Sequence, residues 1–315
     1  MLATSPMMLY ALACLLAIPA AEAETYKLSQ NNVGSTFLQN FQWETTPNAP
    51  GGRVAYTTQQ ASVASNLTYA NGNTFIMCVD HTTTLNASST VGRQSVRIKS
   101  NAQYGTHLAV FDIHHMPQGC GTWPAIWEAD DTVGLKNGEL DILEGVNSLS
   151  GYTTLQHERG MHDAGESRAD WVSSPQASGN SGCSVSSPSS NSFGPTFNSI
   201  GGGWYVIERN PTALSVWFWA RNDGSVPATV SGGASTISTV GWKTPLAYFP
   251  SSPTCNLSTN LKNHNIIINT MLCGSWAGTR YSVSGCPSDC ISYVNANPSA
   301  FVNAYWEFAA LRVYL

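Results

Sequence analysis

The chain has 315 residues and a formal net charge of −5, and only 10% of its residues are charged. No basic patch breaks this mildly acidic composition, so nucleic acid is not an expected partner. With about 290 residues left after a short leader, the chain is long enough for one sizeable core, within the range of single-domain all-β sandwiches.

The N-terminus has the pattern of a secretory signal. Residues 8–20 form an apolar run that is too short to span a membrane comfortably, and Ala21 and Ala23 are the small residues that a signal peptidase accepts. The residues before this run contain no Lys or Arg, which departs from the usual pattern. We expect residues 1–23 to be removed and residues 24–315 to form one secreted domain without a membrane anchor.

Short β-rich runs then alternate with Gly, Pro, Ser and Asn, and no long amphipathic helix is evident. Many short strands separated by turn residues favour a sandwich. The clearest runs are residues 53–57, 95–99, 107–114, 204–208, 214–219 and 265–269. Residues 158–203 are expected to form a long surface excursion, pinned by Cys183, rather than a second domain.

Eight cysteines are present, and seven remain once Cys14 leaves with the leader. The spacing of Cys286 and Cys290 could suggest a metal knuckle, but no second pair or His set completes one. Disulfides are the better interpretation for an exported chain. An odd number requires at least one free thiol, and Cys78, within a strand-like run, is the expected buried one.

Three sequons are plausible glycan acceptors in a secreted chain. They begin at Asn66, Asn86 and Asn256.

Three carboxylates crowd into six positions of residues 138–145 (GELDILEG), namely Glu139, Asp141 and Glu144. Side chains two apart on a strand share a face, so Glu139 and Asp141 point the same way. Glu144 would point the opposite way unless one extra residue, at Ile142 or Leu143, forms a β-bulge. With that bulge, all three acids lie on one face.

Clustered carboxylates suit glycoside hydrolysis, which needs one ionised carboxylate and one protonated carboxylic acid. Retaining enzymes need these groups about 5–5.5 Å apart. A flat strand would separate the Cα atoms of Glu139 and Glu144 by roughly 13–16 Å, at about 3.3 Å per residue, so a concave sheet is also required. The rival interpretations are a polar strand face exposed to water and a Ca²⁺ site, although this stretch is too strand-like for a calcium loop.

Three tryptophans could provide the apolar platforms on which pyranose rings stack. Trp123 and Trp127 precede the acids with a spacing of four, and Trp276 lies in a Gly-rich stretch that is expected to be a loop. The alternative for each is a core tryptophan.

The acidic motif Glu-x-Asp-x-x-Glu resembles the signature of the laminarinase-like branch of glycoside hydrolase family 16. Further similar stretches are residues 93–100, 116–127, 265–269, 273–276, 303–307 and 312–314. The resemblance covers residues 25–315 and is greatest to secreted fungal endo-β-1,3(4)-glucanases. It implies an all-β fold, a concanavalin-like β-jelly-roll sandwich with a concave substrate cleft.

The resemblance also implies roles for single residues. Trp123, Trp127 and Trp276 are similar to the family's glucose-stacking residues, and Arg97 to an arginine that donates hydrogen bonds to sugar hydroxyls. The alternative for Arg97 is a solvated charge on a strand face. His157 has the spacing from Glu144 that the family keeps for a histidine beside the catalytic acids; its alternative is a lone surface histidine.

Two departures from the family pattern are visible. The sequence after His157 is charged and lacks the Thr and Cys residues of relatives, and Gly134-Leu135 stands where relatives have a Trp-Pro pair. The first departure puts in doubt the loop beyond His157, and the second removes a stacking wall on one side of the cleft.

The sequence thus predicts a monomeric retaining endo-β-1,3(4)-glucanase acting on β-glucan without cofactor or metal. Glu139 would be the nucleophile and Glu144 the general acid and base. Asp141 would hydrogen-bond Glu139 and help to keep the proton on Glu144. The alternatives are a transglycosylase that uses the same acids and a non-catalytic glucan-binding lectin.

Overall fold

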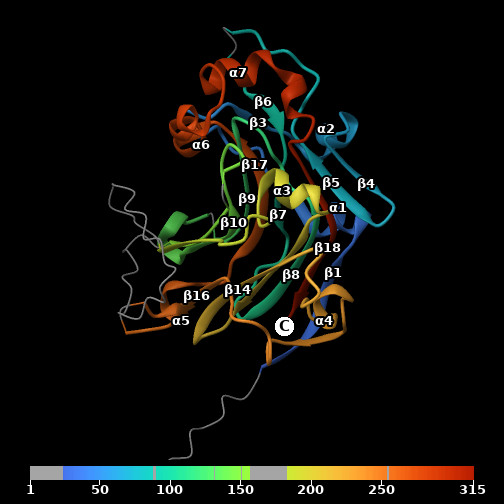
Figure 1. Cartoon of the computed structure of the whole chain (residues 1–315), viewed down its shortest axis with the longest axis vertical. Coiled ribbons are helices and arrows are strands. Elements are labelled where there is room, and N and C mark those ends of the chain that lie inside the picture. Colours follow the sequence, from blue (N-terminus) through green and yellow to red (C-terminus); the bar gives the residue numbers. More distant parts are fainter. Residues whose placement is uncertain (1–23, 88–89, 131, 150, 157–182, 254) are drawn as a thin grey trace, which may run out of the picture.

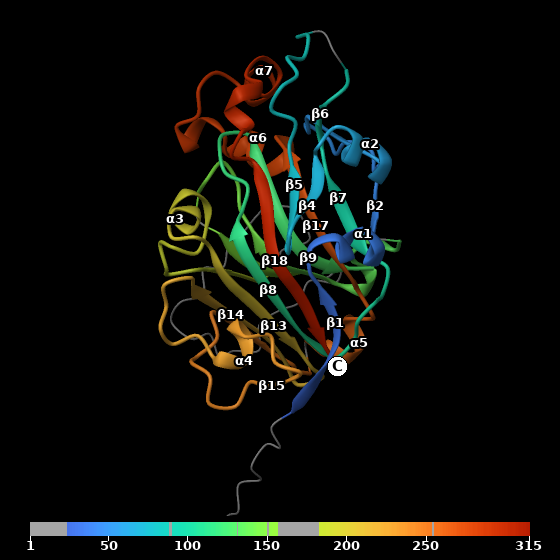
Figure 2. The same ribbon diagram turned by 90° about the vertical axis from the view of Figure 1, so that its right-hand side faces the viewer.

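The computed structural model describes residues 24–87, 90–130, 132–149, 151–156, 183–253 and 255–315. Within these residues, two large antiparallel sheets face one another (Figures 1 and 2). The first sheet has nine strands. Seven of them follow the order β15 (Thr236–Ser238), β1 (Thr25–Asn32), β18 (Tyr305–Tyr314), β8 (His107–His115), β13 (Gly203–Arg209), β14 (Ala213–Ala220) and β16 (Ala247–Pro250). The other two are β5 (Thr74–Cys78), which pairs with β18, and β4 (Thr68–Asn71), which pairs with β5.

The second sheet has seven strands in the described part of the chain and carries the acidic motif. Their order is β12 (Cys183–Ser186), β11 (Tyr152–Gln156), β10 (Glu139–Glu144), β9 (Thr122–Ala129), β17 (Asn265–Leu272), β7 (Arg97–Ser100) and β2 (Phe41–Trp43). A small parallel pair, β3 (Val54–Tyr56) and β6 (Arg93–Ser95), lies at one end.

The main core lies between the two large sheets, because alternate residues of their strands are apolar and face inward. Phe111 of β8 and Tyr205 of β13 belong to this core, as do Ile126 of β9, Leu140 of β10 and Ile268 of β17. Burial of this apolar surface is the main stabilising contribution, at about 25 cal/mol per Å².

The helices of the described chain are short and lie at the ends and edges of the sandwich. In Figure 1, α6 and α7 lie at the top beside β3 and β6, and α4 lies at the opposite end. The α-helices are α1 (Phe37–Asn40), α2 (Gln59–Ala64), α3 (Gly194–Ser199), α4 (Ala228–Ser231), α5 (Leu257–Asn260), α6 (Gly274–Arg280) and α7 (Cys290–Ala296), and the 3-10 helices are η1 (Gly34–Thr36), η2 (Gly134–Asn137), η3 (Ser282–Ser284) and η4 (Pro298–Phe301). Among the described residues, none of the helices has the length and apolar character needed to cross a membrane.

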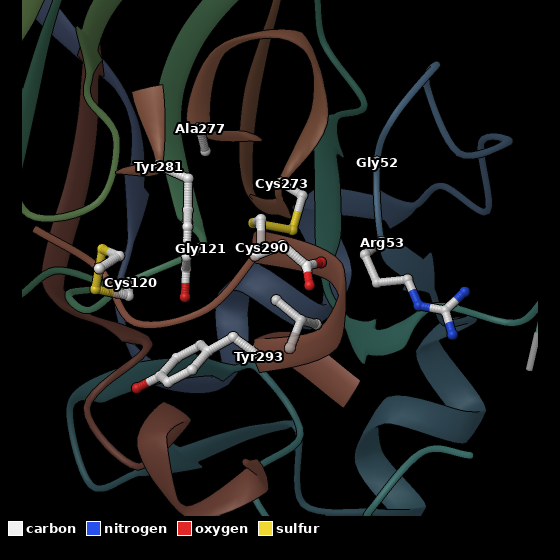
Figure 3. The surroundings of a disulfide bond; sticks show 12 residues. Gly52, Arg53, Cys120, Gly121, Cys273, Ala277, Tyr281, Cys290 and Tyr293 are labelled. Atoms are coloured by element: carbon white, nitrogen blue, oxygen red, sulfur yellow. A yellow bond between two sulfur atoms is a disulfide. The ribbon is translucent and has the colours of Figure 1, made fainter. Parts of the chain in front are cut away.

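Two disulfides fasten the α6–α7 end of the molecule. Cys273 bonds Cys290, and Cys120 bonds Cys286, so the Cys286/Cys290 pair takes part in two separate disulfides (Figure 3). The predicted free thiol at Cys78 is confirmed, but this residue is partly exposed rather than buried.

In two segments the structure differs from the prediction. Residues 95–99 form two strands rather than one, because the chain changes partners at Val96: β6 pairs with β3, and β7 pairs with β2 and β17. The described part of the surface excursion predicted at residues 158–203, which begins at residue 183, contains β12, which extends the second sheet, and α3. Residues 157–182 and the Cys183 side chain lie outside the described residues.

Candidate active site

The predicted bulge is present in β10. Asp141 pairs with Trp127 of β9, and the next pair is Leu143 with Ile126, so Ile142 is the extra residue. Leu140, Ile142 and Leu143 are buried in the core. Because two consecutive residues face inward, the alternation resumes with Glu144 on the same face as the first two acids.

The glycine that follows the third acid allows a close contact. A Cβ on Gly145 would approach the Phe193 ring to 2.5 Å, so a larger residue would displace either the ring or the strand. Phe193 also packs against Gly151, at the start of the return path into β11. This packing fixes the end of β10.

All three acids line one open pocket of about 380 Å³. Asp141 is buried, with 5% of its surface exposed, whereas Glu139 and Glu144 are partly exposed. The other lining residues are Thr46, Pro47, Ala49, Val54, Tyr56, Arg97, Trp123, Ala125, Trp127, Asn269 and Met271.

The environment of Glu139 favours the protonated carboxylic acid. Burial and the charge of Asp141 raise the pKa of Glu139 to about 8, whereas Arg97 lowers it. Neighbouring carboxylates titrate as a coupled set, so this cluster holds a proton at neutral pH.

Arg97 is fixed by contacts on two sides. Its Nε donates to Glu44 Oε2 over 2.7 Å, and its guanidinium lies 4.9 Å from the centre of the Trp127 ring. Lys99 forms a second ion pair with Glu44, over 2.5 Å. The Arg97 side chain is only 14% exposed, so it is not a solvated charge on a strand face.

Trp127 is held from its polar edge as well. Its Nε1 donates to Asn269 Oδ1 over 2.8 Å, and Asn269 Nδ2 donates to Tyr56 Oη over 3.2 Å. Trp127 therefore contributes ring surface to the pocket, while its N–H group is bonded within the protein.

Three aromatic rings form a wall beside Glu144. Trp123 Nε1 donates to Glu144 Oε2 over 3.4 Å, and the Trp123 ring meets the Trp276 ring edge-on, with centroids 5.5 Å apart. The centroid of the Tyr152 ring lies 5.7 Å from that of Trp276. We call Trp123, Trp276 and Tyr152 the aromatic wall.

The structure thus brings together most of the residues predicted for the site. The three acids, Arg97, Trp123 and Trp127 line the pocket, and Trp276 adjoins it through Trp123. The prediction that Trp276 lies in a loop was wrong: it lies in helix α6, because the Gly-rich stretch closes a helical turn after Cys273. His157 lies outside the described residues.

Four residues that complete the pocket or support it were not predicted from the sequence. Glu44 anchors Arg97, Asn269 and Tyr56 orient Trp127, and Met271 lines the pocket. Only Asn269 carried a sequence signal, as a polar residue directly after three isoleucines. In the described residues, no group of three or more His, Cys, Asp or Glu side chains is placed to hold a metal ion.

Residues 41–314 match the XgeA-like catalytic GH16 domain. The chain therefore belongs to glycoside hydrolase family 16.

A curated relative, a probable endo-1,3(4)-β-glucanase of Aspergillus niger, is 35% identical over 94% of this chain. The aligned region covers 41% of that relative, so the chain spans less than half of its length.

Two solved structures share the fold over nearly the whole chain. Laminarinase 16A of Phanerochaete chrysosporium, solved with β-glucans in its donor and acceptor sites, is 46% identical, with a TM-score of 0.87, and covers 93% of this chain and 100% of that chain. An elongating family 16 β-1,3-glucosyltransferase is 29% identical, with a TM-score of 0.81 and coverages of 92% and 100%. These similarities confirm the predicted jelly-roll sandwich.

Proposed function

We propose that this protein is a secreted endo-β-1,3(4)-glucanase that hydrolyses internal bonds of laminarin-type β-glucans with retention of configuration. The observation that carries the proposal is the set of three carboxylates on one face of the bulged strand β10, lining an open pocket. The names of the relatives from A. niger and P. chrysosporium point to the same class of substrate.

In the proposed mechanism, the Glu139 carboxylate attacks the anomeric carbon and forms a glycosyl ester. The bond to the leaving sugar breaks as Glu144 gives its proton to the departing oxygen. Glu144 then takes a proton from water, whose oxygen displaces Glu139 from the anomeric carbon and restores the free enzyme.

The mechanism requires the proton of the carboxylate cluster to reside on Glu144 when Glu139 attacks. Arg97 favours this arrangement because a cation stabilises the ionised form of Glu139. Asp141 is buried and lies close to both glutamates in the sequence. Its charge makes it unfavourable for all three carboxyl groups to be ionised at the same time.

The walls of the pocket suit a neutral polysaccharide. Trp123, Trp127 and Trp276 offer ring surfaces against which the C–H faces of glucose units can pack. Because the pocket is open, a long chain can pass through without presenting its end. The open pocket therefore supports cleavage of internal bonds. We also propose that the protein is a monomer, because all residues proposed for the site come from one chain.

We also propose secretion and glycosylation. The disulfides Cys120–Cys286 and Cys273–Cys290 are typical of an oxidising compartment. The sequon residues Asn66, Asn86 and Asn256 are all exposed, as glycan acceptors must be.

A second candidate is glucosyl transfer, in which another sugar replaces water as the acceptor of the glycosyl group. The similarity to the elongating glucosyltransferase supports this second candidate. Chromatography of products from a pure oligosaccharide distinguishes the two, because transfer makes products longer than the starting material.

The test is oligosaccharide release from laminarin by the purified protein and by its Glu139→Gln variant. We expect release by the parent and at least an approximately 10³-fold loss in the variant, because an amide is a poor nucleophile. If neither folded protein releases sugars, the hydrolase proposal fails for this substrate. Binding to insoluble β-1,3-glucan would then decide whether the protein is a lectin.

A further inference from the structure

The turn after β10 is clasped to the start of β9. Asn147 and Ser148 both have left-handed backbone conformations, with φ of 52° and 61°. Ser148 Oγ accepts a hydrogen bond from the Gly119 N–H over 2.6 Å, and the Asn147 N–H donates to the Thr122 carbonyl over 3.0 Å. The turn that begins at Asn147, three residues after the proposed acid Glu144, is therefore held in place by hydrogen bonds to the start of β9 and to Gly119 before it.

The Asn147 side chain joins three segments of the chain. It is 5% exposed, and its Oδ1 accepts from the Gly121 N–H over 2.8 Å. Its Nδ2 donates to the Ala277 carbonyl of α6 over 2.9 Å and to Ser284 Oγ of η3 over 3.2 Å. An amide is suited to this place because it offers both an acceptor and two donors.

The bond to Ala277 lies in the middle of helix α6. Its N-terminal end is already held by the Cys273–Cys290 disulfide and by the hydrogen bond from the Cys273 N–H to the Gly121 carbonyl, over 2.8 Å. Figure 3 shows Gly121 and Ala277 close to this disulfide. The bond from Asn147 reaches Ala277, the residue directly after Trp276, and so joins the turn after β10 to the middle of the helix.

We propose that Asn147 is a positioning residue that holds Trp276 against Trp123 and thereby sets the aromatic wall relative to Glu144. This proposal rests on the proposed function and extends it to the residue that shapes the sugar-binding surface. Asn147 touches no sugar; it acts through α6.

The test variant is Asn147→Asp. Aspartate keeps the acceptor for the Gly121 N–H, but its second carboxylate oxygen meets the Ala277 carbonyl oxygen, which can only accept, and the two repel each other. Asn198→Asp is the matched control: Asn198 Nδ2 also donates to two oxygens, those of Met116 and Gln118, but it lies on α3. If Asn147→Asp does not fold, Asn147→Gly replaces it, since glycine readily adopts a positive φ.

The first readout is kinetic and uses laminarin oligosaccharides. We expect Asn147→Asp to raise KM about tenfold with little change in kcat, because it weakens sugar binding and leaves the acids in place. In a Trp276→Ala background, the same substitution should give no further rise, since residues that act through one contact are not additive. Asn198→Asp should leave KM unchanged.

The second readout needs no activity. Near-ultraviolet circular dichroism of Asn147→Asp should show altered tryptophan bands, because the contact between the Trp123 and Trp276 rings changes, and Asn198→Asp should not. An unchanged spectrum, or an equal rise of KM in both backgrounds, would overturn the role of Asn147. A parent protein that neither cleaves nor binds laminarin would instead refute the proposed function, and the spectra would still decide the positioning role.

Discussion

Glu139 lies where an ionised carboxylate is unfavourable, since burial and Asp141 raise its pKa to about 8 while Arg97 lowers it. Arg97 is itself held by Glu44 and lies over Trp127. The charge that assists the proposed nucleophile is thus fixed by residues that take no part in the proposed chemistry. Single residues at this site have to be understood together with the groups that hold them.

Replacing Arg97 by Gln should shift the acidic limb of the pH profile of kcat/KM to higher pH by about one unit. The cation lowers the pKa of Glu139, so its removal raises that pKa, and a higher pH is needed to ionise the nucleophile. Arg97→Lys, which keeps the charge, should shift the limb less. An unchanged limb in both variants would show that Arg97 does not govern the ionisation of Glu139.

At the scale of the element, the bulge in β10 decides which residues face the pocket. Ile142 is inserted opposite β9, so the register on either side of it is that of a regular strand. Removing it would leave all three acids on the same face, whereas removing Leu140 would turn Glu139 toward the core.

Deletion of Ile142 should therefore keep activity within about 10²-fold of the parent, because the acids move but do not change faces. Deletion of Leu140 should lower activity by at least about 10⁴-fold. Both deletions remove one fully buried aliphatic side chain, but deletion of Leu140 also turns a carboxyl group toward the core and so costs more stability. The rate of laminarin hydrolysis by the folded variants measures the difference. Equal losses of activity in the two variants would show that activity does not depend on which face of β10 carries the acids.

The sequence was sufficient to predict this bulge, since three acids in six positions share a face in a strand only if one residue is extra. It did not predict helix α6, because glycines at positions 274 and 278 indicate a loop when the Cys273–Cys290 disulfide is unknown. Nor could it reveal Asn147, whose side-chain partners lie 26 to 137 residues away in the sequence.

At the scale of the whole molecule, a buried ionic cluster joins the two large sheets. Glu128 of β9 contacts His107 of β8 over 2.9 Å and Arg209 of β13 over 3.5 Å, and these side chains are at most 6% exposed. Burial alone would raise the pKa of Glu128. The contacts with His107 and Arg209 together outweigh burial and lower this pKa below its usual value, so the carboxyl group is ionised. Glu128 lies on the core face of the strand whose other face carries Trp123 and Trp127.

Replacing Glu128 by Gln should lower the free energy of unfolding by about 3 kcal/mol, because it leaves a buried arginine without its counter-charge. The control is Glu307→Gln, which affects a partly exposed pair with His114 and should change stability by less than about 0.5 kcal/mol. Urea denaturation measures both. Equal effects would show that the cluster does not contribute to holding the sheets together.

The sandwich as a whole followed from the sequence because strand periodicity and turn residues are local signals. The detail of the cleft did not, because it depends on pairs such as Arg97 with Glu44, 53 residues apart, and Trp127 with Asn269, 142 residues apart. Such contacts arise only when the strands are placed side by side. The motif alone therefore located the acids but not the groups that hold their neighbours.

The central claim is that Glu139 and Glu144, brought to one face by the bulge, carry out two successive displacements at the anomeric carbon. Proton NMR of laminarin in the first minutes of hydrolysis tests it most directly, by recording the configuration of the new reducing ends before they mutarotate. Two displacements predict that the β-anomer appears first and the α-anomer only later. Initial release of the α-anomer would contradict the account, because it requires a single displacement by water.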